Sequence, residues 1–481
     1  MNPNYLLTLP LAQRLYREVA ASLPIIDYHN HLSAREIREN RKFENITRLW
    51  VAADPYKHRA MRILGVEERF ITGNASDEEK FRVWYESLPR LIGNPLFDWS
   101  MMELSTVFGM ELLPLRPWQE VWQQLNAALQ TLTPQDILGK FNILYSAPCT
   151  ALTDDLSVYG VLTCHCEERS DVAIPEALGD CHAQSADWAR NDTSLGGNLA
   201  PSLRGDDLLL PAPALLQKLE QLTEIKIESL ASYLQAVEVR LAAFRAVGCR
   251  FADHALDNGF RYVPDDGENS RRFAALLAGQ SLSPEDQLQL RSRICRELLV
   301  RYAAVDFTVQ LHIGAQRATS TRLKAAAGAT GGFAAMGSCA DVASLTRLFD
   351  DAEQQALPKI LLFTLNPADN GVMATLSGSY SKDGQEALIS QGPAWWWCDH
   401  YQGIFDMLDD FCCHSVLSTF VGMTTDSRSL LSFVRHDYFR RCLCQWLAEQ
   451  VSRQRLPDDF EILADAVRRI CFENANKRIG G

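Results

Sequence analysis

Two histidines one residue apart, His29 and His31, close a short apolar run in the stretch LPIIDYHNHL (residues 23–32). If this run is a strand, side chains at positions i and i+2 project to the same side, so the two imidazoles point together. Neutral imidazoles placed in this way are good ligands for a divalent metal ion. A pair of partly buried histidines bonded to the backbone explains the same motif equally well, so the rest of the chain has to decide.

The composition is that of an ordinary globular protein, with 481 residues, of which 47% are hydrophobic and 22% charged. At this length we expect one large barrel with an inserted domain, or two to three domains. The net charge of −13 leaves no basic surplus to neutralise phosphates, which argues against general binding to nucleic acid or to an anionic membrane. A small anionic substrate fits only if arginines form a local clamp.

The first residues, MNPNYLLTLPLAQRLYREV, lack the basic segment and long apolar core of a secretory signal. No apolar run approaches the ~20 residues of a membrane span. The 13 cysteines are scattered, and several lie in apolar or helical contexts. We interpret them as reduced core thiols and expect a cytoplasmic protein without membrane or nucleic-acid partners.

Predicted helices and strands alternate over most of the chain. Strands are predicted within 141–147, 249–257, 306–315, 357–366 and 415–429, and the last four follow predicted helices at 215–247, 284–304, 340–356 and 401–413. No glycine-rich nucleotide motif follows any of these strands. The pattern predicts an α/β fold, a (β/α)₈ barrel formed by residues 1–57 and 141–481, with a mainly helical insertion domain at 58–140 after the first strand.

Residues 157–200 break this alternation, because they show no sustained period and are rich in loop residues. Cysteines and histidines gather here, at Cys164, His165, Cys166, Cys181 and His182. Their spacing does not match that of a standard zinc knuckle. We therefore predict a surface insertion outside the barrel rather than a structural zinc site.

Polar side chains with catalytic potential lie at the downstream ends of nearly all predicted strands. They are His29 and His31, Asp253 and His254, His312 and Arg317, Asn366, and Asp426 and Arg428. In a barrel all these ends meet on one face, where such enzymes place their active sites. The first and last strands are neighbours when a barrel closes, so His29, His31 and Asp426 predict a metal site, with His312 completing or flanking it.

Several motifs occur in order over almost the whole chain. They include DYHNHL, RLIGNPLFDW, ADHALD, QLHIGAQR, LPKILLFTLNPADN, GPAWWWCDHYQG, FVGMTTDSRSLLSFVRHDYFRRCLC and ICFENA. Together they closely resemble uronate isomerase (glucuronate/galacturonate isomerase), a branch of the amidohydrolase superfamily. The resemblance implies a TIM barrel of the metal-dependent hydrolase type, and a reaction that interconverts hexuronic aldoses and ketoses by moving a proton between C2 and C1.

The resemblance also implies roles for individual residues. Asp426 matches the final-strand aspartate and is expected to be both the base and a metal ligand, while Tyr56 is expected to stabilise the developing oxyanion. The remaining expected site residues are Arg204, Arg317 and Arg428 for the substrate carboxylate, Trp395 and Trp396 for the pocket wall, His312 and Arg428 for catalysis, and Asp253 and His254 for substrate binding. His254 fits a supporting role equally well, and the WWW run at 395–397 also fits a packed aromatic cluster.

One divalent metal ion is the expected cofactor, held by His29, His31 and Asp426 with His312 near it. Zinc is the expected occupant, and manganese or iron are alternatives because the order of affinities does not fix the working metal. We also expect a small sugar acid as substrate and a homo-oligomeric assembly.

The sequence departs from the family pattern around the substrate. Pro55 stands where the family has a histidine before the tyrosine, and Leu203 replaces a tryptophan before the substrate arginine. Residues 98–104 (DWSMMEL) lack two histidines, and 317–321 (RATST) replaces an asparagine-rich run. These departures leave several alternatives open: a divergent uronate isomerase, an enzyme for another sugar acid, a metal-dependent hydrolase of the superfamily, or a weakly active or non-catalytic relative.

Overall fold

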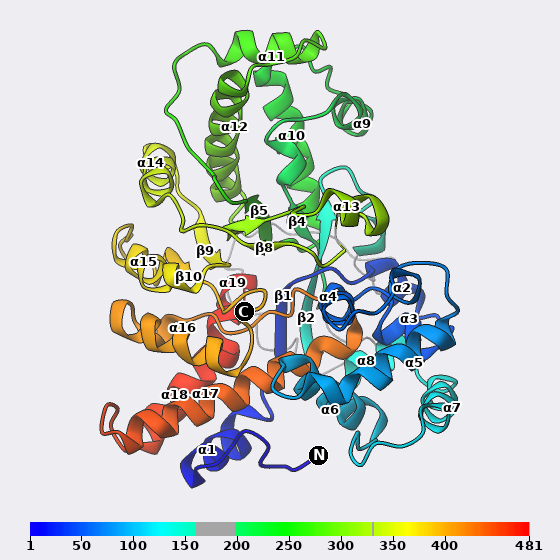
Figure 1. Ribbon diagram of the computed structural model, residues 1–481. Helices are drawn as coiled ribbons and strands as arrows, with labels where there is room; N and C mark the ends of the chain where they lie inside the picture. The colour runs from blue at the N-terminus through cyan, green and yellow to red at the C-terminus, as the bar shows by residue number, and fades with distance from the viewer. Residues whose placement is uncertain (160–197, 330, 481) are drawn as a thin grey trace, which may run out of the picture.

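A parallel β-sheet that curls around a buried interior forms the centre of the protein (Figure 1). The computed structural model describes residues 1–159, 198–329 and 331–480. Seven strands follow one another around the sheet: β1 (Ile25–Asn30), β2 (Ile143–Ala151), β4 (Ser202–Arg204), β5 (Phe251–Leu256), β6 (Thr308–Ile313), β9 (Lys359–Thr364) and β10 (Ile389–Gln391). The two-residue β3 (Asn198–Leu199) adds to β2, and β7 (Ala315–Gln316) pairs with β8 (Ala335–Met336) in a separate ribbon. The predicted α/β fold with a parallel sheet is confirmed.

Residues 424–427 fill the eighth position of the barrel, beside β1, and we call them the closing segment. The amide of Asp426 donates to the carbonyl of His29 at 3.0 Å, and the amide of His31 donates to that of Ser427 at 2.8 Å. Asp426 itself has a left-handed backbone with φ of 45°, which interrupts a regular ladder. The strand predicted within 415–429 was therefore wrong: a 3₁₀ turn at Leu417–Thr419 and this irregular segment take its place.

The strands are apolar along most of their length because helices cover their outer face. The long covering helices are α10 (Leu230–Ala246), α12 (Pro284–Ala304), α14 (Val342–Glu353), α16 (Tyr401–His414) and α17 (Val434–Ser452) (Figure 1). The other helices outside the β1–β2 region are shorter: α1 (Pro10–Leu15), α9 (Pro213–Thr223), α11 (Asn269–Leu277), α13 (Thr321–Ala327), α15 (Asn370–Thr375), α18 (Phe460–Arg468) and α19 (Asn474–Ile479).

Helix α12 shows why the sequence forms these elements. Ser283 caps its first turn by accepting a hydrogen bond from the amide of Asp286, and Pro284 occupies the first helical position, where no amide is needed. Leu290, Ile294 and Leu298, spaced by four, are fully buried toward the barrel.

Between β1 and β2 the described chain is helical, with α2 (Ala34–Glu39), α3 (Ile46–Trp50), α4 (Pro55–Ile63), α5 (Asp77–Ser87), α6 (Pro95–Phe108), α7 (Trp118–Leu129) and α8 (Pro134–Lys140). Their apolar side chains share one core with α17, as the edge-on contact between Trp99 and Tyr438 shows. The division of the chain into two domains stays a prediction.

Most of the insertion predicted at 157–200, with its cysteines and histidines, lies outside the described residues. In the parts of the chain that the structure describes, no helix has both the length and the apolarity needed to cross a membrane.

Candidate active site

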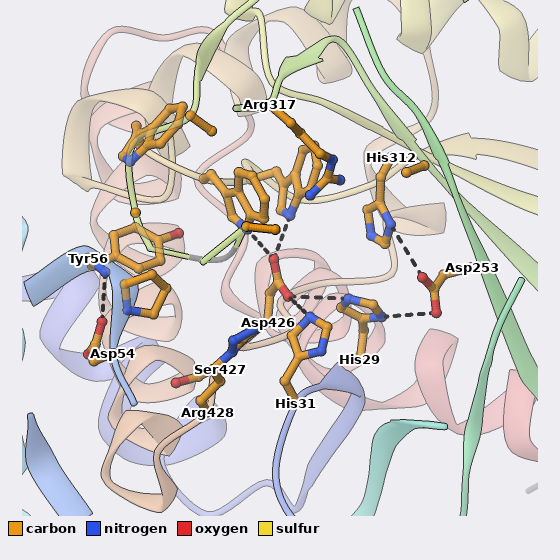
Figure 2. A pocket seen from close by; sticks show the side chains of 18 of the residues that line it. His29, His31, Asp54, Tyr56, Asp253, His312, Arg317, Asp426, Ser427 and Arg428 are labelled. Carbon is orange, nitrogen blue, oxygen red and sulfur yellow. Dashed lines mark hydrogen bonds and ion pairs between the residues drawn. The ribbon is translucent and has the colours of Figure 1, made fainter. Parts of the chain in front are cut away.

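A cavity opens at the carboxyl ends of the strands, where a barrel enzyme is expected to carry its site (Figure 2). Of the predicted residues with an assigned site role, all but one line it: His29, His31, Tyr56, Arg204, Asp253, His312, Arg317, Trp395, Trp396, Asp426 and Arg428. Asn366, also predicted at this edge, does not line the cavity and instead caps the turn Pro367–Asp369. The side chains that line the cavity belong to segments far apart in the sequence, from β1 to residues 426–428.

In the cavity, Asp426 faces His29 of β1 and His31, which follows the end of that strand. Its Oδ1 lies 3.2 Å from Nε2 of His29 and 3.0 Å from Nε2 of His31. The backbone bonds between β1 and the closing segment set this distance, so the pairing follows directly from barrel closure. Burial alone would raise the pKa of Asp426, but hydrogen bonds from His29 and His31 hold it well below its usual value. The carboxylate is therefore charged at neutral pH.

The second oxygen of Asp426 is held by two indoles. Trp395 Nε1 donates to Oδ2 at 2.8 Å, and Trp396 Nε1 donates to the same atom. The tryptophans thus do more than pack against each other, because they fix the direction of the carboxylate.

His312 lies beside this cluster on β6. Its ring centroid is 4.7 Å from that of His29 and 4.8 Å from Trp395, against which it stacks. Its Nδ1 lies 3.9 Å from Asp253, whereas its buried Nε2 has no hydrogen-bond partner among the described residues. Burial and the nearby charge of His29 lower the pKa of His312 well below its ordinary value, so the imidazole is neutral.

Cys149, at the end of β2, is a member of the cluster that sequence reasoning missed. Its Sγ lies 3.5 Å from Nδ1 of His29 and 3.5 Å from Oδ1 of Asp253. One ligand atom each from His29, His31 and Cys149 fall within 4.8 Å of one another. The strand-end argument that found the histidines applies equally to the strand predicted at 141–147, which Cys149 follows.

The donors gathered here suit a divalent transition metal ion. Imidazole, carboxylate and thiol are the groups that zinc and its neighbours prefer. The unpartnered Nε2 of His312 is a further donor facing the same space. His29, His31, Cys149 and Asp426 offer ligand atoms that could hold such an ion.

Tyr56 stands on the opposite wall, in the first turn of α4. Its hydroxyl donates to Oδ2 of Asp399 at 3.1 Å, and the guanidinium of Arg435 lies 4.7 Å from the centre of its ring. Arg435 also pairs with Asp399 at 3.5 Å. Burial raises the pKa of Asp399 to about 6, although Arg435 opposes the shift. Sequence reasoning missed both Asp399 and Arg435.

Three arginines face the cavity from separate elements. Arg204 pairs with Asp206 at 3.1 Å, and Arg317 pairs with Asp257 at 2.7 Å. Arg428 follows the closing segment and also lines the cavity (Figure 2). Three guanidinium groups that line one cavity suit an anionic substrate, because each can pair with a carboxylate.

Comparison with known proteins decides the family. Residues 1–175 and 188–478 match the family model described as glucuronate isomerase. The chain belongs to the uronate isomerase family. A uronate isomerase from Caldanaerobacter subterraneus subsp. tengcongensis is 36% identical over 486 residues, which cover 100% of this chain and 99% of the relative, and one from Caldicellulosiruptor saccharolyticus is 35% identical with the same coverage.

Solved structures of the uronate isomerase family share the fold. The uronate isomerase of Thermotoga maritima superposes with a TM-score of 0.86 at 24% identity, over 100% of this chain and 99% of the other. The glucuronate isomerase of Caulobacter crescentus gives 0.84 at 22% identity, over 100% and 96%. At these identities the structures support the fold alone.

His254 is the predicted site residue that the structure does not bring to this uronate isomerase cavity. Successive residues of a strand face opposite ways, so Asp253 points inward and His254 points outward toward α12. There its Nε2 lies 2.9 Å from the hydroxyl of Tyr302. Burial lowers the pKa of His254 to about 4. The position supports the structural interpretation of this residue.

Pro55, where related uronate isomerases are expected to have a histidine, lines the cavity beside Tyr56. It takes the first position of α4, after the capping residue Asp54. His58, three residues later, is buried and its Nε2 lies 3.1 Å from the carbonyl of Val51, away from the cavity lining. His58 therefore does not replace the missing histidine.

Proposed function

We propose that this protein interconverts hexuronate aldoses and ketoses, D-glucuronate with D-fructuronate and D-galacturonate with D-tagaturonate. The observation that carries the proposal is the carboxylate of Asp426, which is oriented by Trp395 and Trp396 at the floor of an arginine-lined cavity. The full-length relatives are isomerases, which favours this reaction over hydrolysis.

In the proposed reaction Asp426 takes the proton from C2 of the open-chain sugar and returns it to C1. Its side chain is only 7% exposed, so exchange of this proton with solvent is slow. Tyr56 donates its hydroxyl to Asp399 in the structure, and we propose that this single O–H turns to the oxygen on which charge develops when the substrate is bound. His312 and Arg428, which line the same cavity, are proposed to assist this proton transfer.

The substrate carboxylate is proposed to bind the arginines. Arg204, Arg317 and Arg428 line the cavity, and the guanidinium carbon of Arg317 lies 5.2 Å from the centre of the Trp396 ring. A carboxylate pairs well with guanidinium groups because two parallel hydrogen bonds form at once. Trp396 is proposed to wall the apolar face of the sugar, and Asp253 is proposed to accept a hydrogen bond from one of its hydroxyls.

One divalent ion is proposed at His29, His31 and Asp426, with His312 near it. When bound, the ion supplies a Lewis acid for the sugar oxygens. Zinc is the proposed occupant, with manganese and iron as alternatives.

A homo-oligomer and a cytoplasmic location stay predictions. Two isoleucines of the helical region between β1 and β2, Ile63 and Ile92, are each 74% exposed, which is consistent with an assembly that covers them. Sedimentation of the purified protein would test the assembly.

The test of function is a coupled assay of the metal-loaded protein with glucuronate and galacturonate, in which a reductase reports the ketose. Asp426→Asn is expected to lose on the order of 10²–10⁴ in rate. Asp306→Asn is the matched control, because Asp306 is also an aspartate with left-handed backbone, φ 54°, but lies at the opposite end of the barrel before β6. Equal, near-native rates in both variants would refute the role of Asp426.

A further inference from the structure

The thiol of Cys149 is placed as a metal ligand would be. Its Sγ lies 3.9 Å from Nε2 of His29, the nitrogen that faces Asp426. On a tetrahedral ion with bonds of about 2.0–2.3 Å, nitrogen and sulfur ligands lie about 3.3–3.6 Å apart. The nitrogen–oxygen distances from His29 and His31 to Asp426, 3.2 and 3.0 Å, fall close to the same range.

Two strands and the closing segment bring these atoms together, so the approach of the partly buried Cys149 is built into the fold. β1 and the residue just after it supply the imidazoles of His29 and His31, and the closing segment supplies the carboxylate of Asp426 (Figure 2). The thiol of Cys149 comes from β2. Next to them, Nε2 of His312 has no partner in the described part of the chain, although the side chain is only 5% exposed. A buried donor group without a partner indicates that something else occupies the space it faces.

We propose that Cys149 is a sulfur ligand of the same ion as His29, His31 and Asp426. This inference rests on the metal-dependent site of the proposed function. On coordination the thiol loses its proton to solvent and sulfur binds as the thiolate. A sulfur ligand favours zinc and cobalt over manganese and magnesium, which prefer oxygen. The site therefore selects a thiophilic ion by its own chemistry.

Cobalt is the probe that separates this proposal from a thiol that merely donates to Asp253. Purified full-length protein is stripped with a chelator and loaded with Co²⁺, and its absorption is recorded in the near ultraviolet, where thiolate-to-cobalt charge transfer absorbs. The wild type is expected to show this band and Cys149→Ala to lose it. Cys295→Ala is the matched control, since Cys295 is a buried cysteine of α12 far from the cavity, and it should keep the band.

Zinc affinity gives a second reading. Loss of a direct ligand is expected to weaken zinc binding in Cys149→Ala by about 100-fold or more, the upper end of what lost outer-shell partners cost. Manganese binding should change much less than zinc binding. Equal loss of both ions would contradict a sulfur ligand.

Alkylation of the wild-type thiols tests the proposal without any substitution, so it also applies if Cys149→Ala does not fold. In the wild type, zinc is expected to slow the modification of Cys149 at least tenfold, with the exposed Cys339 as internal standard. Bound cobalt without the sulfur band, or equal alkylation with and without zinc, overturns the proposal and leaves the isomerase assignment intact. Failure to bind any ion would instead refute the metal site itself.

Discussion

Replacement of Pro55 by histidine should accelerate this enzyme. Hexuronates in water are almost entirely cyclic, so the ring must open before C2 can react. A histidine next to the tyrosine suits this step because its pKa lies near neutrality, whereas proline cannot transfer a proton. Pro55 lines the cavity, and His58 is committed to the carbonyl of Val51.

The backbone around Pro55 tolerates the change. Pro55 is the first residue of α4, where the amide that histidine would add needs no helical partner. Its carbonyl lies against Gly332, an approach made by main-chain atoms that the substitution leaves in place. Loss of the ring should cost only about 0.4–1 kcal/mol of stability through the unfolded chain.

General acid–base groups contribute on the order of 10²–10⁴ in rate. Because the new imidazole is not optimised in position, we expect Pro55→His to gain at least tenfold, which corresponds to about 1.4 kcal/mol of barrier. The parent, Pro55→His and Pro55→Ala are compared on the same uronate. The alanine variant removes the ring without adding an acid, so it should show no gain.

A substrate analogue that cannot cyclise isolates the ring-opening step, and Pro55→His should give no advantage on it. An unchanged rate in an already fast parent would refute the reasoning, because another residue must then open the ring. A gain of equal size on the analogue would place the effect at the proton transfer between C2 and C1.

Three further predictions concern the metal and stability. Elemental analysis of His29→Ala/His31→Ala should find the bound metal lost, and undiminished metal would contradict the assigned ligands. Because the pKa of Asp399 is raised from 3.8 to about 6, the wild type should lose up to about 3 kcal/mol of stability relative to Asp399→Asn as pH rises between those values, measured by denaturant unfolding; a pH-independent difference would contradict it. Gly205→Ala places a methyl group 2.2 Å from the imidazole of His254 on β5, and it should lower the free energy of unfolding by about 1–3 kcal/mol in the same denaturant experiment. Gly139→Ala, with open space around it, should cause no measurable loss.

The sequence predicted elements best where a periodic pattern of apolar residues extended over many positions. Helix α12 begins and ends at the predicted residues because its cap, its proline and its buried spacing agree. The strands within 249–257, 306–315 and 357–366 were found for the same reason. β4 and β10, each three residues long, carry too few positions for any period, and they were missed.

Within the site, prediction succeeded for residues at strand ends and failed for contacts made by other elements. His29, His31 and Asp426 could be brought together because closing the barrel makes the last segment a neighbour of the first strand. Asp399 meets Tyr56 across 343 residues from the loop before α16, and Arg435 comes from a helix beyond the last strand, so no strand-end argument reaches them. His254 shows the opposite error, because the two-residue period of a strand already forbade it to face the same way as Asp253.

Barrel closure joins residues that the ribosome synthesises at very different times. Thr424 reaches back across 395 residues to bond the carbonyl of His29. A ribosome that adds about 5–20 residues per second needs roughly 20–80 s to cover that interval. During this time the nascent chain carries two imidazoles without their carboxylate partner. The proposed ligand set is therefore complete only after Asp426 has been synthesised, and in the proposed site metal loading follows that step.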